Sequence, residues 1–155
     1  MSIPVNKYRQ WVASLHESIN QLGEDLQIAL MKPAGIRCAS DLLSLCENQH
    51  GKKADTIEDL IGAWNDIRNQ RGLKGKWEFE GDTVRGIFHE CGCPLVRSGM
   101  IVLHPLQCYC SQGMMETVFP KVMGKTVPVE IQRSIARGDD VCEFVVNLQP
   151  VLTKG

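Results

Sequence analysis

Apolar residues in the first half of the chain recur at spacings of three and four, the period of an amphipathic helix. The first stripe predicts a helix that ends near Gly23, with Ser2 as a suitable N-cap. Its apolar members are Val5, Tyr8, Val12, Leu15, Ile19 and Leu22. A stripe this regular also matches a helix–helix dimer contact, but we expect it to pack against the core of the same chain.

Three further helical segments are predicted before residue 72. Residues 24–32 keep the apolar register and are stopped by Pro33, because proline lacks a backbone N–H and clashes with the preceding turn. A short helix is expected at 40–48. Thr56 and Asp59 form a capping-box pattern that opens a fourth helix ending near Gly72. The buried stripe of that helix is expected to be Ile57, Leu60, Ile61, Trp64 and Ile67.

Beyond residue 75 the apolar period becomes two, as in a β-strand. Strands are predicted at 76–80 and 83–90, joined by a turn at 80–82, and at 127–135 and 141–148. Between these hairpins, 111–123 has the pattern of a helix that Pro120 shortens or kinks. We expect an α+β fold, with a helical N-terminal half packed on an antiparallel sheet made of two β-hairpins separated by a helix. One domain is expected over 1–155, divided into a helical part (1–72) and a β-hairpin–helix–β-hairpin part (76–149).

The composition narrows the class of protein without indicating a function. The 155 residues are 43% apolar and carry a formal net charge of −1, which gives no support for a nucleic-acid or membrane-surface partner. No apolar run is long enough to span a bilayer and no signal-peptide pattern opens the chain, so we expect a cytoplasmic protein. In a reducing compartment the seven cysteines should be free thiols, metal ligands or redox centres rather than disulfides.

Four of these cysteines form two Cys-x-Cys pairs, Cys91/Cys93 and Cys108/Cys110. In an extended backbone residues i and i+2 point the same way, so each pair can offer two sulfurs to one ion. That geometry requires Cys108 and Cys110 to precede the helix, with Ser111 as its N-cap. Zinc suits such a thiolate set, and an iron–sulfur cluster is disfavoured because nothing else suggests electron transfer. Plain buried thiols and a reversible dithiol pair are the alternatives.

Three cysteines lie outside the two pairs. Cys142 begins the last strand on its core-facing side, so that burial in the core and metal ligation are both open. Cys38 and Cys46 fall on predicted helices at a spacing that does not place them on one ridge, and both are expected in the core.

Four further side chains are candidates for a ligand site. His89 aligns in the pleat with Cys91 and is a candidate metal ligand or general base, although a hydrogen-bonded histidine is the expected state. Tyr109 and Met114 are candidate pocket residues. Arg133 falls on a strand face that should be apolar, so it needs an anionic ligand, a carboxylate partner or a β-bulge. A bulge is expected.

The C-terminal half carries a more specific pattern: Cys108-Tyr-Cys-Ser-x-Gly, Phe119, Gly124-Lys-x-Val-x-Val-Glu and Arg137-Gly-Asp-x-x-Cys142-x-Phe144. This pattern resembles the 4-vinyl-reductase, or hydrocarbon-binding, small-molecule-binding domain. Combined with Cys91-x-Cys93-Pro, it is similar to proteins grouped with L-2-amino-thiazoline-4-carboxylic acid hydrolase. The stretch from Met31 to Ala39 also looks like the helical region of that group.

The resemblance implies a ligand pocket between the sheet and the helices, often in a homodimer, and in some relatives a structural zinc beside the pocket. The implied zinc ligands present in this chain are Cys108 or Cys110, and Cys142. The relatives' glutamate and cysteine ligands on the third strand fall on Ile131 and Ser134 here, so Cys91 or Cys93 would have to replace them.

Three functions follow from these features. The first is a sensor-like domain that binds a small molecule beside a zinc site drawn from Cys91, Cys93, Cys108, Cys110 and Cys142. The second is a hydrolase that opens a cyclic C–N bond of a thiazoline-carboxylate-like substrate. Its candidates are His89 as the base, Cys110 as the thiolate and Arg133 for the substrate carboxylate. The third is a thiol redox or metal-carrier protein.

Overall fold

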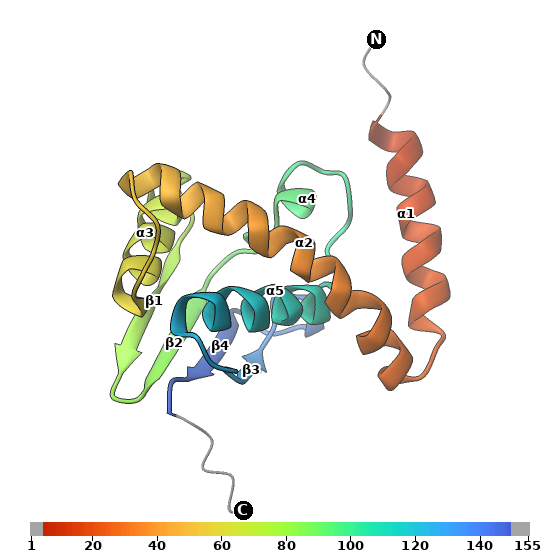
Figure 1. The fold of residues 1–155 in the computed structure, drawn as a ribbon. Helices are drawn as coiled ribbons and strands as arrows, with labels where there is room; N and C mark the ends of the chain where they lie inside the picture. Colours follow the sequence, from red (N-terminus) through yellow and green to blue (C-terminus); the bar gives the residue numbers. More distant parts are fainter. Residues whose placement is uncertain (1–4, 150–155) are drawn as a thin grey trace, which may run out of the picture.

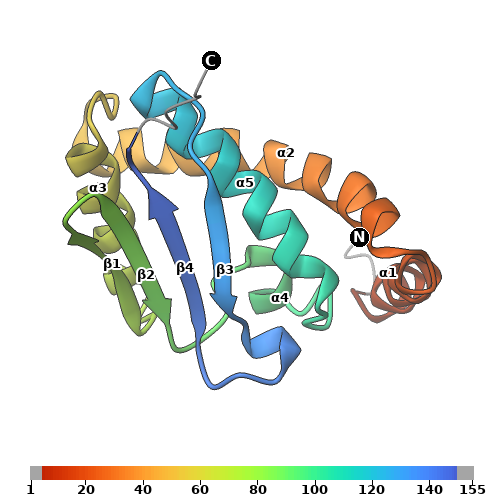
Figure 2. The same cartoon turned by 90° about the horizontal axis from the view of Figure 1, so that it is seen from below.

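Helices cover one face of a four-stranded antiparallel sheet in the computed structural model, which describes residues 5–149 (Figure 1). The helices are α1 (Val5–Asn20), α2 (Glu24–His50), α3 (Ile57–Gln70), the short α4 (Pro94–Arg97) and α5 (Leu106–Met123). The strands are β1 (Gly75–Glu80), β2 (Thr83–Phe88), β3 (Val129–Arg133) and β4 (Cys142–Asn147), in the order β1-β2-β4-β3. No described helix crosses the other face of the sheet, which lies open in Figure 2. The predicted α+β fold is confirmed, while the predicted cap at Ser2 lies outside the described residues.

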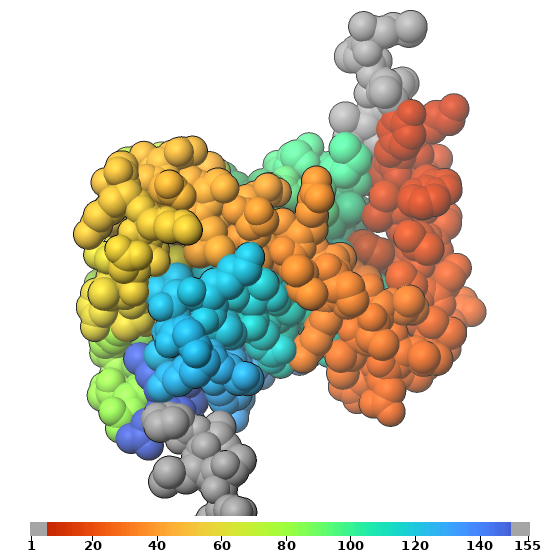
Figure 3. Space-filling model, viewed as in Figure 1, coloured from red at the N-terminus to blue at the C-terminus, as the bar shows by residue number. Residues whose placement is uncertain are grey.

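α1 leaves most of its apolar stripe in water. Tyr8, Leu15 and the adjoining Leu22 are 44%, 45% and 40% exposed. The helix runs along one edge of the molecule (Figure 3) and is fixed there through His16, whose buried Nε2 lies 3.2 Å from the side-chain amide nitrogen of Gln107 on α5. The expectation that this stripe packs against the core is therefore wrong for its exposed members.

α2 is a single helix of 27 residues that continues through Pro33. The predicted stop at that proline and the separate helix at 40–48 are therefore wrong. The cause is tertiary packing, because α2 lies against α5 at two glycines. A Cβ at Gly35 would collide with the Cys110 carbonyl, and one at Gly113 would collide with the Lys32 carbonyl. Contact this close along both helices favours one continuous α2 despite the hydrogen bond that proline cannot make.

No helix within residues 5–149 has the length and apolar character needed to cross a bilayer.

α3 and the first hairpin follow their sequence patterns. The Thr56 side-chain oxygen accepts a hydrogen bond from the Asp59 N–H at 3.1 Å, as the capping pattern predicts. The apolar stripe of α3 faces the sheet, with Leu60 fully buried. The turn between β1 and β2 contains Gly81 at a φ of +58°, a conformation that favours glycine. α3 and the hairpin together build one wall of the molecule.

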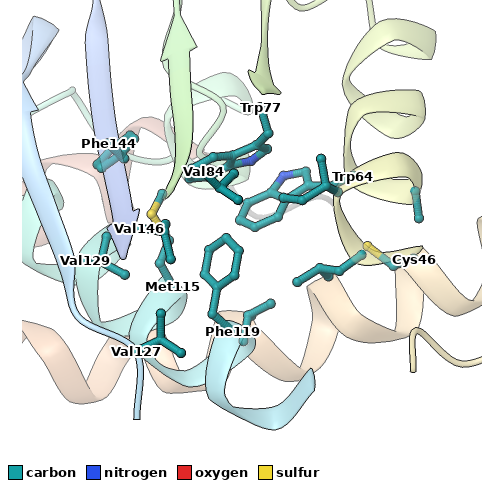
Figure 4. Close-up of a cluster of buried hydrophobic side chains, with 14 of the residues drawn as sticks. Cys46, Trp64, Trp77, Val84, Met115, Phe119, Val127, Val129, Phe144 and Val146 are labelled. Carbon is teal, nitrogen blue, oxygen red and sulfur yellow. The ribbon is translucent and has the colours of Figure 1, made fainter. Parts of the chain in front are cut away.

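The core lies between the sheet and the helices and is centred on aromatic rings (Figure 4). Trp77 from β1 is 2% exposed, and its ring centroid lies 5.2 Å from that of Trp64 on α3 and 5.5 Å from that of Phe119 on α5. These separations are in the range of favourable aromatic pairs. Phe144 of β4 closes the cluster at 6.4 Å from Trp77. Helices and strands therefore share one hydrophobic core.

α5 begins at Leu106, five residues before the predicted start at Ser111. Cys108 and Cys110 consequently lie inside the helix, and the prediction that they precede it is wrong. The N–H of Leu106 bonds to the His104 ring nitrogen, Nδ1, at 3.1 Å, which gives the helix an earlier beginning than the serine signal indicated. The later Pro120 is accommodated inside the helix.

The pairing of β3 with β4 contains the expected bulge. The register shifts between Ile131 and Arg133, which turns the arginine away from the core-facing alternation. Arg133 then pairs with Glu143 of β4, Nε to Oε1 at 2.9 Å, on the open face of the sheet. The bulge predicted from the misplaced arginine is confirmed.

Candidate functional site

A cavity of about 210 Å³ opens between α2, α3, α5, the ends of β2 and β4, and the loop at residues 90–94. Its apolar lining includes Trp64, Ile67, Phe88, Met114, Met115 and Phe144. The candidate ligand residue Met114 therefore lies in this cavity, beside the aromatic core. The pocket is bounded by helices on one side and sheet on the other, which is where the family resemblance places a ligand.

The close contact of α2 with α5 positions two sides of this cavity. Gly35 admits the backbone of α5, and one helical turn further along α2 the side chain of Cys38 reaches the cavity wall. On the strand side Gly86 leaves room for the rings of Trp77 and Phe88, because a Cβ there would stand 2.7 Å from ring carbons of both. Small residues thus set the spacing that keeps the cavity open.

Five of the seven cysteines line the cavity: Cys38, Cys91, Cys93, Cys110 and Cys142. Burial raises the pKa of the Cys38, Cys91 and Cys142 thiols, and it raises the pKa of Cys110 to about 12. These four thiols are therefore neutral at physiological pH and act as weakly polar lining. The prediction that Cys38 lies in the core is wrong, and the signal for its position was its place one turn after Gly35.

Cys108 lies on the other side of α5. It is buried, and its sulfur is 2.9 Å from the Ser134 hydroxyl. Residues two apart on a helix diverge by about 200°, so Cys108 and Cys110 cannot present both sulfurs to one ion. In residues 5–149 no group of three or more histidine, cysteine, aspartate or glutamate side chains is arranged to hold a metal. The side chains as placed do not form the predicted zinc site.

The other candidate residues lie outside the cavity. His89 is exposed beyond the end of β2, because the strand stops at Phe88 and the pleat does not extend to Cys91. The hydroxyl of Tyr109 donates to the Glu24 carboxylate at 3.2 Å, away from the cavity. Arg133 is engaged on the open face of the sheet.

The lining also contains a buried arginine that the sequence analysis missed. Arg68 of α3 is 7% exposed, and its guanidinium carbon lies 4.1 Å from the centroid of the Phe88 ring. Its Nη2 donates to the Lys74 carbonyl at 3.4 Å, and its Nε has no hydrogen-bond partner in the described part of the chain. A signal did exist, because Arg68 stands four residues after Trp64, in register with the buried stripe.

Residues 6–152 match DUF6144, a family of unknown function. The chain belongs to this family. No curated protein matches the sequence. The resemblance to the thiazoline-carboxylate hydrolase group and to the hydrocarbon-binding domain stays a prediction.

Solved structures share the fold of this DUF6144 chain at low sequence identity. A trafficking protein particle complex subunit 3 from Naegleria fowleri, covalently bound to palmitic acid, has a TM-score of 0.62 at 13% identity, covering 97% of this chain and 95% of that chain. The phenol-responsive sensory domain of the transcription activator PoxR, solved with phenol, has a TM-score of 0.56 at 14% identity, covering 90% and 73%. An H-NOX protein from S. oneidensis in the Fe(II)NO state has a TM-score of 0.56 at 12% identity, covering 97% and 78%.

Proposed function

We propose that this chain is a small-molecule-binding domain whose ligand occupies the cavity between α2, α3, α5 and the sheet. The observation that carries the proposal is the cavity itself, whose lining combines aromatic and methionine side chains with neutral thiols. Concave sites with a mainly apolar lining and a few polar groups are typical of ligand pockets. A sensory role is supported by the shared fold with the phenol-responsive domain of PoxR.

The volume of the cavity limits the ligand. A cavity of about 150 Å³ holds benzene, whereas pockets for drug-sized ligands measure about 300–1,000 Å³. At about 210 Å³, this cavity suits one aromatic ring with a small substituent. A long acyl chain, such as the palmitic acid bound to the trafficking subunit, would extend beyond this volume.

Phenol is a suitable first probe, because it has this size and is neutral at physiological pH. We expect phenol to bind one site per chain and to change the fluorescence of Trp64, which lines the cavity. Ser111→Leu, which adds a larger side chain to the cavity wall, should weaken phenol binding at least about tenfold. Lys121→Leu is the control, because this exposed residue of the same helix lies outside the cavity. Equal phenol affinity in the wild type and both variants would place the ligand elsewhere.

A second candidate function is binding of a soft metal ion, zinc first, by the cavity cysteines. It is favoured by the convergence of Cys38, Cys93 and Cys110 from three different segments on one cavity. The five cysteines of the cavity are the predicted ligand set with Cys38 in place of Cys108. Binding would require the side chains to rearrange, since they form no metal group as placed. Zinc analysis of anaerobically purified protein tests this proposal.

The control for the metal experiment comes from the same helix. Cys38→Ala should lower the zinc content, whereas Cys46→Ala should not, because Cys46 is buried outside this cavity. Zinc absent from the wild type would end this proposal and leave the small-molecule proposal untouched. Hydrolysis of a cyclic C–N bond and thiol redox chemistry stay predictions of the sequence, and the exposed position of the candidate base His89 gives the hydrolase no support.

A further inference from the structure

Arg68 is a buried cation with few hydrogen-bond partners and no ion pair in the described part of the chain. Of its five N–H donors, one is used in a described hydrogen bond, and that bond to the Lys74 carbonyl is long at 3.4 Å. No carboxylate of residues 5–149 forms an ion pair with this guanidinium. An arginine that is 7% exposed normally has a charged or fully hydrogen-bonded partner, because an unpaired buried charge is costly.

The surroundings hold the guanidinium in place without a direct ion pair. One face of it lies against the Phe88 ring, and Gly92 of the loop at 90–94 leaves space for Nη1, since a Cβ there would stand 2.7 Å from that nitrogen. The Glu90 carboxylate also lines the cavity and attracts the guanidinium, but it forms no ion pair with it, and its Oε1 accepts the backbone N–H of Lys74 at 2.9 Å. The guanidinium is therefore oriented at the cavity wall and has N–H donors that make no described hydrogen bond.

The other charged groups of the lining do not supply the missing anion. The Asp41 carboxylate is exposed, and Arg71 is itself a cation. Burial raises the pKa of the Cys91 and Cys142 thiols that face Arg68, so they are neutral at physiological pH and are not thiolate partners. Glu90 attracts the guanidinium without pairing with it, so a ligand is the remaining source of a carboxylate in direct contact with Arg68.

We propose that the natural ligand of this cavity is a small organic anion, a carboxylate on a single ring, and that Arg68 binds its carboxylate. The proposal rests on the proposed ligand-binding function and adds the charge of the ligand to it. A planar guanidinium matches a carboxylate in a two-pronged contact, which a lysine cannot reproduce. The apolar part of the ligand would lie among the aromatic and methionine side chains of the lining.

Benzoate and benzamide form the test pair, because they have nearly the same size and shape and differ in charge. We expect wild-type protein to bind benzoate about 10- to 100-fold more tightly than benzamide in calorimetry at neutral pH, the value of hydrogen bonds to a buried charged group. Equal affinities, or tighter binding of benzamide, would overturn the proposal. In that outcome bound phenol or benzamide would still support the ligand-binding function. Failure of all three probes to bind would overturn both.

Variants assign the effect to Arg68. Arg68→Met keeps the length of the side chain and removes its charge, so it should abolish the preference for benzoate while leaving benzamide binding within about threefold. Arg37→Met is the control, an exposed arginine of α2 that lies outside the lining and should keep the preference. Arg68→Lys covers the case in which the methionine variant does not fold, and it should lose most of the preference because lysine lacks the fork geometry. A preference that persists in Arg68→Lys, or is lost equally in Arg37→Met, would contradict the role of Arg68.

Discussion

At the scale of single residues, Asn65 ties α3 to the outer strand of the sheet. Its amide nitrogen donates to the Trp77 carbonyl and its amide oxygen accepts the Trp77 N–H, both at 2.9 Å. These two hydrogen bonds occupy backbone groups of β1 that would otherwise be unpaired at the sheet edge. One side chain therefore holds the central tryptophan of the core in register.

Asn65→Ala should lower the free energy of unfolding by about 1–3 kcal/mol, because it removes both hydrogen bonds and leaves the partly buried Trp77 backbone groups without partners. Urea denaturation followed by tryptophan fluorescence measures the change. Asn69→Ala on the same helix is the control, since its exposed side chain makes none of these contacts. A loss as large in the control would show that helix propensity rather than the edge contact is responsible.

Glu143 forms the centre of a charge cluster on the open face of the sheet. Arg133 donates to one carboxylate oxygen and Arg85 to the other, and these bonds lower the pKa of Glu143. A lowered carboxylate pKa stabilises the fold above the unfolded-state pKa of about 4.3, and this stabilisation is lost as the pH falls through the lower folded-state value. The cluster is therefore a pH-dependent contribution to stability.

Glu143→Gln should destabilise the protein by up to about 1 kcal/mol at neutral pH, since water on the open face screens the pairs. The free energies of unfolding of the wild type and of Glu143→Gln should converge as the solution is acidified below about pH 4. Denaturant titrations at several pH values test this, with Glu130→Gln, an exposed carboxylate whose described partner is the Gln132 amide, as the control. A difference that stays constant with pH would mean that the glutamine is badly packed.

The surroundings of a side chain could be predicted from the sequence where they depend on neighbouring residues, and not where they depend on a distant segment. The misplaced Arg133 indicated its own bulge, because strand alternation is a property of neighbouring residues. The burial of Arg68 beside the cavity was not predictable, since it depends on the fold around Lys74, Phe88 and Gly92. The same holds for Cys38, which reaches the cavity through the contact of α2 with α5.

Among the elements, α2 and α5 shape the cavity, because their backbones come into close contact where the two helices cross. Gly113→Ala would place a Cβ against the Lys32 carbonyl, and backbone there cannot move aside cheaply. We expect a loss of about 1–3 kcal/mol in thermal or urea unfolding. Gly62→Ala in α3 is the matched control, because its Cβ would meet the His50 ring at an ordinary 3.6 Å and helix propensity should then make it neutral or stabilising. Stability gained in both variants would disprove the steric argument.

The boundaries of elements were the least predictable part of the fold. Pro33 and Ser111 are sound local signals for a helix end and a helix start, but α2 continues through the first and α5 begins before the second. In both cases a contact distant in sequence, or a cap from an unexpected residue such as His104, outweighs the local preference. The early start of α5 has a chemical consequence, because it turns Cys108 and Cys110 to opposite sides.

For the molecule as a whole, the antiparallel sheet followed from simple patterns, whereas the strand order β1-β2-β4-β3 did not. Two hairpin signals separated by a helix were enough for an antiparallel sheet, and one apolar face per strand placed the helices over it. What these patterns could not provide is the surface that stays exposed. The stripe on α1 is as regular as a core stripe, yet Tyr8, Leu15 and Leu22 stay exposed in the part of the chain that the structure describes.

The exposed apolar surface of α1 predicts a homodimer formed through this helix. Trp11 and Leu15 on α1 and Leu26 on α2 are 66%, 45% and 54% exposed, and patches of this kind mark association sites. A second copy is the fitting partner, because an apolar stripe at helix–helix spacing is complementary to itself and a net charge of −1 does not oppose association. Sedimentation should show a wild-type dimer that Trp11→Glu converts to a monomer. Phe79→Glu, at another exposed apolar site on the far hairpin, should stay dimeric. A wild-type monomer at every concentration would assign the stripe to another partner.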